Sequence, residues 1–366
     1  MYDVHSTILD LPFDAHPDPD EFLRAAMQWH FSPDTGSRFW LERAPALEFD
    51  PRTDVRTFDD LALFPNLTDE LRDVRAADLI PRGYGEHPDV VGIYDSGGTT
   101  GPPKRVVALR DSWQRSLAWT TARFEAHGCP RGRDWLALFP SGPHMVGVLF
   151  PTVAAALGGY SFTIDMDPRW VKKLVAAGRS DEADAYAEHL IDQAAFALAT
   201  QDIGVLAATP PLLERLARRE DLVDLVRRKV RVIVWGGAHM DADTRALLRT
   251  EVFPGIELCG LYGSTMVLGG AVERPGLSAD DPCIFDPSPP SISFRVVDPR
   301  TGQRVGYGER GQVVMNHVSK SFLLPNNLER DMALRIRPPE GQVGDSVADV
   351  TPVPQFEGET VIEGVY

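Results

Sequence analysis

The residues best suited to chemistry form one string, Asp95-Ser96-Gly97-Gly98-Thr99-Thr100-Gly101-Pro102-Pro103-Lys104, directly after the apolar run Val90 to Tyr94. Its glycines allow tight turns that point backbone N–H groups toward an anion. The hydroxyls of Ser96, Thr99 and Thr100 and the ammonium of Lys104 add further donors. The P-loop pattern is excluded, because Lys104 is followed by Arg105 rather than Ser or Thr. We therefore predict a phosphate-binding loop of another class, and the alternative interpretation is a surface turn.

Other short motifs follow this loop in a fixed order. They are Phe139-Pro140-Ser141-Gly142-Pro143-His144 with Gly147, Val234-Trp235-Gly236-Gly237-Ala238, Leu261-Tyr262-Gly263-Ser264-Thr265, Gly308-Glu309-Arg310-Gly311 and Gly344-Asp345. Each motif alone is weak. Together, and in this order, they resemble the adenylate-forming acyl- and aryl-CoA synthetases, the AMP-binding superfamily. The stretch Asn326 to Arg337 is most similar to the phenylacetate-CoA ligase branch.

The resemblance implies roles for individual residues and two cofactors, ATP and Mg²⁺. Lys104, Thr265 and His144 would be catalytic: Lys104 and Thr265 would contact phosphates, and His144 would orient the carboxylate or close its pocket. Adenine would lie near Gly236, Gly237, Ala238 and Tyr262, and Asp345 would hold the ribose hydroxyls. The full nucleotide-binding set would be Ser96, Gly97, Gly98, Thr99, Thr100, Gly101, Gly236, Gly237, Ala238, Tyr262, Gly263, Ser264 and Asp345.

Two features depart from the family pattern. Met266 stands where the family has an acid that binds magnesium, and a thioether is a poor ligand for this hard ion. We therefore name no metal ligand; Glu273 is a candidate by proximity in sequence alone. The chain also ends soon after Asp345, so we expect the mobile C-terminal domain with its catalytic lysine to be absent, and CoA ligation by the chain alone to be lost.

The short form is similar to adenylating proteins of phenazine antibiotic biosynthesis on the griseoluteic acid route. This implies an aryl carboxylic acid substrate, a phenazine carboxylate among the candidates, and transfer of the acyl-AMP to a downstream reductase or transferase. A homodimer is one arrangement left open. Two alternatives remain: an acyl-protein synthetase that loads a fatty acid onto a cysteine, and a non-catalytic nucleotide-binding partner.

Composition excludes several function classes. The net charge of -16 disfavours nucleic acid and anionic membranes as partners. The cysteines Cys129, Cys259 and Cys283 are odd in number and contain no Cys-x-x-Cys pair, so neither a disulfide framework nor a zinc cluster is indicated. The start of the chain shows no secretion signal, and the apolar stretch Met145 to Gly159 is too short to span a bilayer, so we expect a cytoplasmic protein.

The elements that must position these motifs alternate between strands and helices. We expect helices from Asp18 to Phe31, 111 to 127, 181 to 199, 210 to 226 and 241 to 252, and strands at 90–94, 135–139, 205–208, 230–235 and 256–261. This alternation is typical of a doubly wound parallel sheet. The predicted fold is layered α/β over 1–274, the large N-terminal domain of an adenylate-forming enzyme, followed by a small β-barrel-like portion over 275–366.

Overall fold

The computed structural model describes residues 8–12, 15–96, 102–278 and 281–353, together with the backbone of two short strands at 355–356 and 359–360. The chain divides into two compact units. The first comprises residues 1–119, 264–270 and 286–347, and the second comprises 120–263, 271–285 and 348–366. This division differs from the predicted boundary at 274, because the strands β8, β9 and β13 each supply residues to both units.

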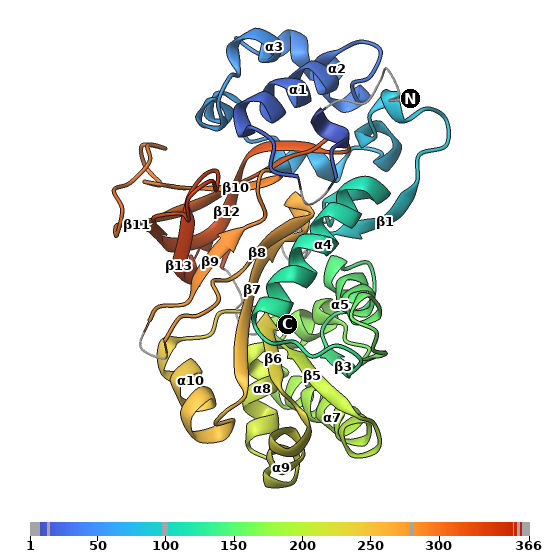
Figure 1. Ribbon diagram of the computed structural model, residues 1–366, viewed down its shortest axis with the longest axis vertical. Helices are drawn as coiled ribbons and strands as arrows, with labels where there is room; N and C mark the ends of the chain where they lie inside the picture. Colours follow the sequence, from blue (N-terminus) through green and yellow to red (C-terminus); the bar gives the residue numbers. More distant parts are fainter. Residues whose placement is uncertain are drawn as a thin grey trace. The chain divides into compact units, whose positions relative to one another are not determined.

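The second unit contains a parallel sheet. Its strands are β3 (Asp134–Leu138), β4 (Ser161–Thr163), β5 (Ile203–Ala208), β6 (Val232–Gly236) and β7 (Glu257–Ser264), in the order β7-β6-β5-β3-β4. The connecting helices are α5 (Met145–Ala156), α6 (Pro168–Ala176), α7 (Ser180–Thr200), α8 (Pro210–Ala217), α9 (Glu220–Lys229) and α10 (Ala242–Leu247), with a π-turn at Leu248–Val252. The predicted α/β class is therefore confirmed (Figure 1).

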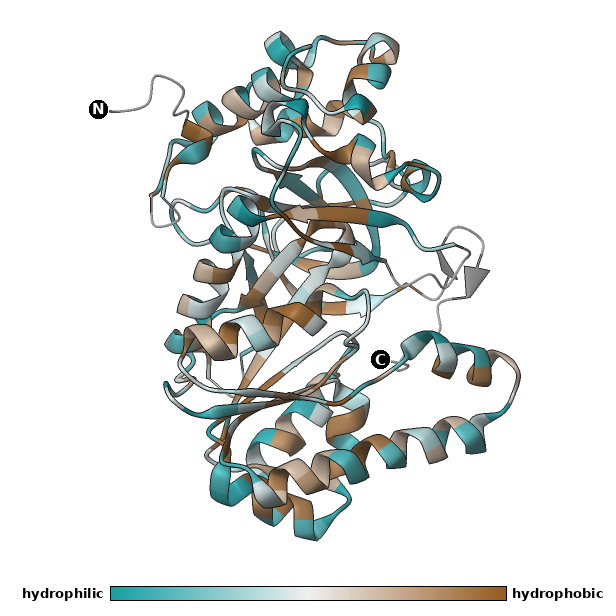
Figure 2. Ribbon diagram, turned by 90° about the vertical axis from the view of Figure 1, so that its right-hand side faces the viewer, coloured by the Kyte–Doolittle hydropathy of each residue, from teal (hydrophilic) through white to brown (hydrophobic). Residues whose placement is uncertain are grey.

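The strands and helices of this unit are buried in the way expected for a sheet covered by helices. All six residues of β5 are buried, as in a strand covered on both faces. Figure 2 shows hydrophobic and hydrophilic residues alternating around the helices, as expected where each helix buries one side. The core includes Trp135, whose ring lies 5.7 Å from that of Phe124 and 6.3 Å from that of Phe150. None of the described helices is both long and apolar enough to cross a membrane.

The first unit combines short helices with antiparallel strands. Its helices are α1 (Pro19–Phe31), α2 (Arg38–Arg43) and α3 (Pro51–Asp54), with 3₁₀ turns η1 (Ile8–Asp10), η2 (Ala44–Ala46), η3 (Phe58–Leu63), η4 (Thr68–Arg72), η5 (Ala76–Leu79), η6 (Arg82–Tyr84) and η8 (Thr265–Val267). Asp18 caps α1 by accepting from the Glu21 N–H at 2.9 Å, as its sequence pattern predicts. Helix α4 (Arg110–Ala126) begins in this unit and ends in the second.

Antiparallel pairing provides the strands of the first unit. Strands β1 (Val90–Asp95) and β2 (Arg105–Leu109) pair with each other, and β10 (Ile292–Val297), β11 (Arg310–Val318) and β12 (Leu323–Ile336) pair in sequence order. The remaining strands are β8 (Gly269–Glu273), β9 (Ile284–Pro287), β13 (Ser346–Pro352), β14 (Gln355–Phe356) and β15 (Glu359–Thr360). Among the described residues after 275, every assigned helix or strand is a strand.

Two local predictions are corrected. The segment 105–109 is the strand β2, which was not expected because it is short and adjoins a helix without a turn residue. The single helix expected from 210 to 226 is two helices, because the chain leaves helical geometry at Arg219, where φ is -105° and ψ is 99°. For the apolar stretch from Met145, a strand-turn or a helix was open, and the structure shows a helix with Pro151 inside it.

Candidate active site

The stem of the predicted phosphate loop is a β-hairpin in the first unit. Asp95 pairs with Arg105, and the Ser96 N–H donates to the Lys104 carbonyl at 2.9 Å. In return, the Lys104 N–H donates to the Ser96 hydroxyl at 3.2 Å. Residues Gly97, Gly98, Thr99, Thr100 and Gly101 lie outside the described residues. The two hydrogen bonds between Ser96 and Lys104 therefore hold the ends of the loop together, and the paired strands β1 and β2 continue from them.

The Lys104 ammonium has an acidic partner within the same unit. Its Nζ lies 2.7 Å from Asp69 Oδ1, and Arg72 binds the same oxygen at 2.9 Å. The Lys104 side chain is 14% exposed, so this pair is partly shielded from water. A triphosphate that binds Lys104 would compete with Asp69, and Arg72 would remain to neutralise the released carboxylate.

Ser264 and Thr265 lie at the turn that follows β7. Ser264 caps the 3₁₀ turn η8, its hydroxyl accepting from the Met266 N–H at 3.3 Å. Leu268 then takes the left-handed conformation, with φ of 49°, and its N–H donates to the Thr265 carbonyl at 3.1 Å. Met266 is only 5% exposed, so its thioether belongs to the hydrophobic core. The structure therefore gives position 266 a packing role.

Asp345 is positioned by a glycine and held by two arginines. Gly344 has φ of +78°, and a Cβ atom there would lie 2.6 Å from the Phe294 carbonyl oxygen, so no other residue fits. The Asp345 carboxylate accepts from Arg335 Nε at 2.9 Å and from the Val296 N–H at 3.1 Å, and Arg304 Nε lies 3.5 Å away.

This carboxylate is 1% exposed. A carboxylate offers about four lone-pair positions, and the hydrogen bonds from Arg335 and Val296 use two of them, while Arg304 forms an ion pair without a hydrogen bond. The predicted ribose contact therefore requires a hydroxyl to reach one of the other positions beside Arg304.

The structure adds Glu329, which the sequence analysis did not single out. Its Oε1 accepts from Asn327 Nδ2 at 2.6 Å, and the nearby Ser264 hydroxyl acts to lower the pKa of the carboxylate. Burial and the neighbouring charge of Asp331 raise the pKa of Glu329. No local motif marks this residue, because Ser264 lies far from it in sequence.

In the second unit, glycines at the end of β6 permit close packing. A Cβ atom at Gly236 would lie 2.4 Å from the Leu261 carbonyl oxygen on β7. Gly237 has φ of +76°, and a Cβ there would lie 3.4 Å from the Phe139 ring. At Gly260 a Cβ would meet the rings of Phe285 at 2.9 Å and Trp235 at 3.0 Å. At positions 236 and 260, protein atoms therefore already fill the space beside the glycine Cα.

Tyr262 and His144 also belong to the second unit. The Tyr262 ring lies 5.7 Å from the Phe285 ring, tilted by 50°, and the exposed Gly263 leads into the Ser264 turn. His144 lies at the N-terminus of α5, and its carbonyl accepts from the Gly147 N–H at 3.0 Å. A Cβ at Gly147 would lie 2.2 Å from the Ser141 carbonyl oxygen. Thus Gly147 permits the tight turn that carries His144.

Ala238 directly follows Gly237, completing the predicted adenine-facing segment. The adjacent His239 is anchored through Nδ1 to the Val350 carbonyl at 2.7 Å. Within the second unit the structure therefore brings Gly236, at the start of this segment, beside Leu261 of β7, the strand that carries Tyr262 and Gly263.

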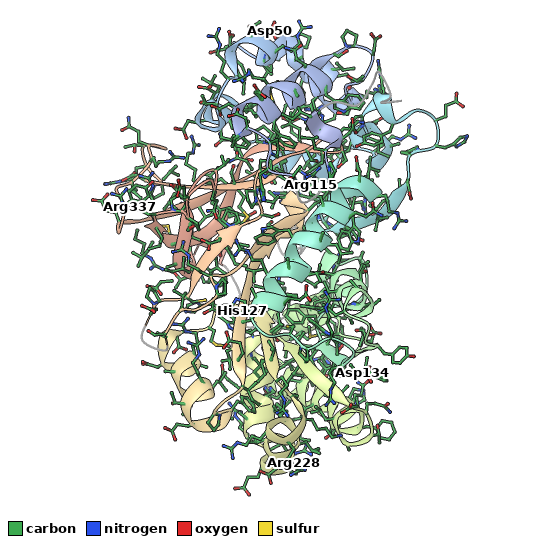
Figure 3. The ribbon with its side chains drawn as sticks, in the orientation of Figure 1. Asp50, Arg115, His127, Asp134, Arg228 and Arg337 are labelled. Atoms are coloured by element: carbon green, nitrogen blue, oxygen red, sulfur yellow. The ribbon has the colours of Figure 1, made fainter. Side chains whose placement is uncertain are left out.

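Glu273 is not available as a metal ligand. Its carboxylate is 2% exposed, accepts from the Gly260 N–H at 2.8 Å, and pairs with Arg245 at 3.3 Å and Arg249 at 3.7 Å. Its backbone carbonyl binds His127 Nε2 at 2.8 Å, while His127 Nδ1 binds Glu257 at 2.8 Å; Figure 3 labels His127. Within the described ranges no group of three or more His, Cys, Asp or Glu residues has the arrangement of a metal site. The sequence-based suggestion that Glu273 binds a metal is therefore corrected. Its carboxylate, on β8, is already bound to the Gly260 N–H on β7 and to Arg245 on α10.

The cysteines are poor candidates for carrying an acyl group. All three, Cys129, Cys259 and Cys283, are buried. Burial raises the pKa of Cys129 to about 12 and the pKa values of Cys259 and Cys283 well above the usual value for a thiol. Since the thiolate is the nucleophile, self-loading on a cysteine is disfavoured.

Comparisons with known proteins agree with the fold. A family model described as AMP-binding enzyme matches residues 55–319. The structure is similar to 2-hydroxyisobutyryl-CoA ligase in complex with 2-HIB-AMP and CoA, with a TM-score of 0.63 and 17% identity, covering 91% of this chain and 67% of that chain. The same ligase in its postadenylation state with 2-HIB-AMP gives 0.63 and 16%, covering 94% and 69%. No curated protein sequence matches the chain.

Proposed function

The chain belongs to the AMP-binding enzyme family, and from this premise we propose that it uses ATP to convert a carboxylic acid to an acyl-AMP, with release of pyrophosphate. Enzymes of this family use ATP. The observation that carries the proposal is the arrangement within the first unit. The hairpin stem with Ser96 and Lys104 leads into β2, and β2 packs against η8, which carries Thr265.

This arrangement suits phosphoryl chemistry. The substrate carboxylate attacks the α-phosphorus of ATP, a new C–O–P linkage forms, and the bond to the bridging oxygen of pyrophosphate breaks. The protein supplies positioning and charge neutralisation rather than a covalent intermediate. Lys104, once released from Asp69, would neutralise phosphate charge, and the Thr265 hydroxyl would donate to the α-phosphate.

We further propose that the acid is aromatic, a phenazine carboxylate being one candidate, and that a downstream reductase or transferase takes the acyl group. Support comes from the second unit, where the Phe139 ring lies beside Gly237. Thr209 lies beside Gly237, and Trp235 lies beside Gly260. The buried Thr209 Oγ1 and Trp235 Nε1 have no hydrogen-bond partner within the part of the chain that the structure describes. Such orphaned groups are expected where a polar ligand completes the site.

The test is acid-dependent exchange of labelled pyrophosphate into ATP, measured across a panel of aryl and fatty acids. Exchange should be fastest with an aryl acid. Lys104→Met should abolish it, while Lys173→Met on the exposed face of α6 serves as the matched control and should retain it. Exchange that prefers fatty acids would refute the aryl assignment, and no exchange with any acid would favour a non-catalytic nucleotide-binding role.

A further inference from the structure

Glu329 lies in a wide irregularity of β12. Gln312 on β11 pairs with Met332, and Val314 pairs with Leu328, so the three residues 329–331 oppose the single residue Val313. The Gln312 side chain fills the gap by donating to the Glu329 carbonyl at 2.8 Å. Bulges redirect side chains and are frequent beside active sites. Here β12 packs against the turn η8, and the redirected carboxylate lies near the Ser264 hydroxyl.

A second set of bonds connects Glu329 to the base of the phosphate loop. Asn327, which donates to Glu329, accepts from the Thr68 hydroxyl at 2.7 Å. The next residue, Asp69, binds Lys104 at 2.7 Å. All of these residues belong to the first unit. The carboxylate of Glu329 is therefore connected both to the turn that carries Thr265 and, through η4, to Lys104.

The chemistry near this turn calls for a hard oxygen ligand. Magnesium is commonly held by one or two carboxylates together with substrate phosphates and water. The buried thioether of Met266 does not fit that need, and Glu273 is occupied by arginines in the other unit. The carboxylate of Glu329 and the hydroxyl of Ser264 do fit, because both offer oxygen atoms. Glu329 is partly buried, and a carboxylate that is partly withdrawn from water is stabilised when a cation lies beside it.

We propose that Glu329 is the protein carboxylate that binds the divalent cation accompanying ATP, in place of an acid at position 266. This inference rests on the proposed adenylation function. When bound, the ion would neutralise triphosphate charge. Glu329 would hold the ion, Asn327 would orient the carboxylate, and the bulge at 329–331 would keep the side chain directed toward Ser264.

Calorimetric titration with ATP, in excess MgCl₂ and separately in EDTA, tests the assignment. The variants are Glu329→Gln, which keeps an acceptor for Asn327 but loses the charge, and Asp331→Asn as the control from the same bulge. Wild type should bind ATP more tightly with magnesium. Glu329→Gln should lose about tenfold or more of that gain, the loss expected for one charged contact, while its affinity in EDTA stays close to wild type. Asp331→Asn should keep the gain.

Different failures have different meanings. Retention of the full magnesium-dependent gain in Glu329→Gln, or an equal loss in Asp331→Asn, would overturn the role of Glu329 while leaving adenylation intact. Absence of ATP binding by wild type under both conditions would instead refute the proposed function. Thermal unfolding checks that each variant folds. If Glu329→Gln does not, Glu329→Asp should still raise the magnesium concentration needed for tight ATP binding, and an unchanged requirement would contradict the proposal.

Discussion

Arg335→Ala should destabilise the first unit because it leaves the buried carboxylate of Asp345 with one partner fewer. Arg335 Nε donates to Asp345 at 2.9 Å, and its NH1 donates to the Val305 carbonyl at 2.6 Å. Removing one member of a buried ion pair costs about 3 to 5 kcal/mol. We expect a loss of about 3 kcal/mol, at the lower end of that range, because Arg304 and the Val296 N–H still contact Asp345.

Arg337 provides a control that separates the ion pair from ring packing. The guanidinium groups of Arg335 and Arg337 lie 4.0 and 4.3 Å from the centre of the Tyr307 ring. Arg337 is exposed (labelled in Figure 3), so Arg337→Ala should cost only about 0.5 to 1 kcal/mol, the value of an exposed cation–π contact.

Urea unfolding at pH 7, followed by tryptophan fluorescence, measures both losses. Arg335→Ala combined with Asp345→Ala should be less destabilised than the sum of the single variants, because the unpaired charge is removed. Equal effects of Arg335→Ala and Arg337→Ala, or strict additivity in the double variant, would show that the buried ion pair contributes nothing.

Three further outcomes follow from other contacts. Burial lowers the pKa of His127, but its bonds to Glu257 and to the Glu273 carbonyl outweigh this and raise the pKa. The stabilisation by His127 should be full below the unfolded pKa of about 6.5 and should be lost as pH rises through the folded pKa. The difference in unfolding free energy between wild type and His127→Asn should therefore shrink as pH rises, and a constant difference would contradict this prediction. Gly236→Ala should cost about 1 to 3 kcal/mol in the same urea assay because its Cβ would lie 2.4 Å from the Leu261 carbonyl oxygen, and wild-type stability would disprove that clash. The three cysteines should resist a thiol reagent until the protein unfolds, since all are buried; rapid labelling of the folded chain would reopen acyl loading on cysteine.

The sequence by itself determined the features that depend on neighbouring residues. Asp18 and Pro19 start α1 through a local cap and a preset φ angle, and strand–helix alternation predicts the parallel sheet. The order of glycine-rich motifs predicts the family that the matching family model confirms. These signals are visible in sequence because the interactions behind them join residues a few positions apart.

Only the tertiary structure decided which charged groups are available for chemistry. Glu273 and Met266 lie seven residues apart, yet the first is held by two arginines and the second is packed in a core. Glu329 lies near Ser264 because β12 carries a bulge, and Asp345 meets Arg304 and Arg335 because the chain turns at Gly344. Spacing in sequence does not report such contacts, since packing between distant strands determines which carboxylate is neutralised by arginine and which is hydrogen-bonded by an amide.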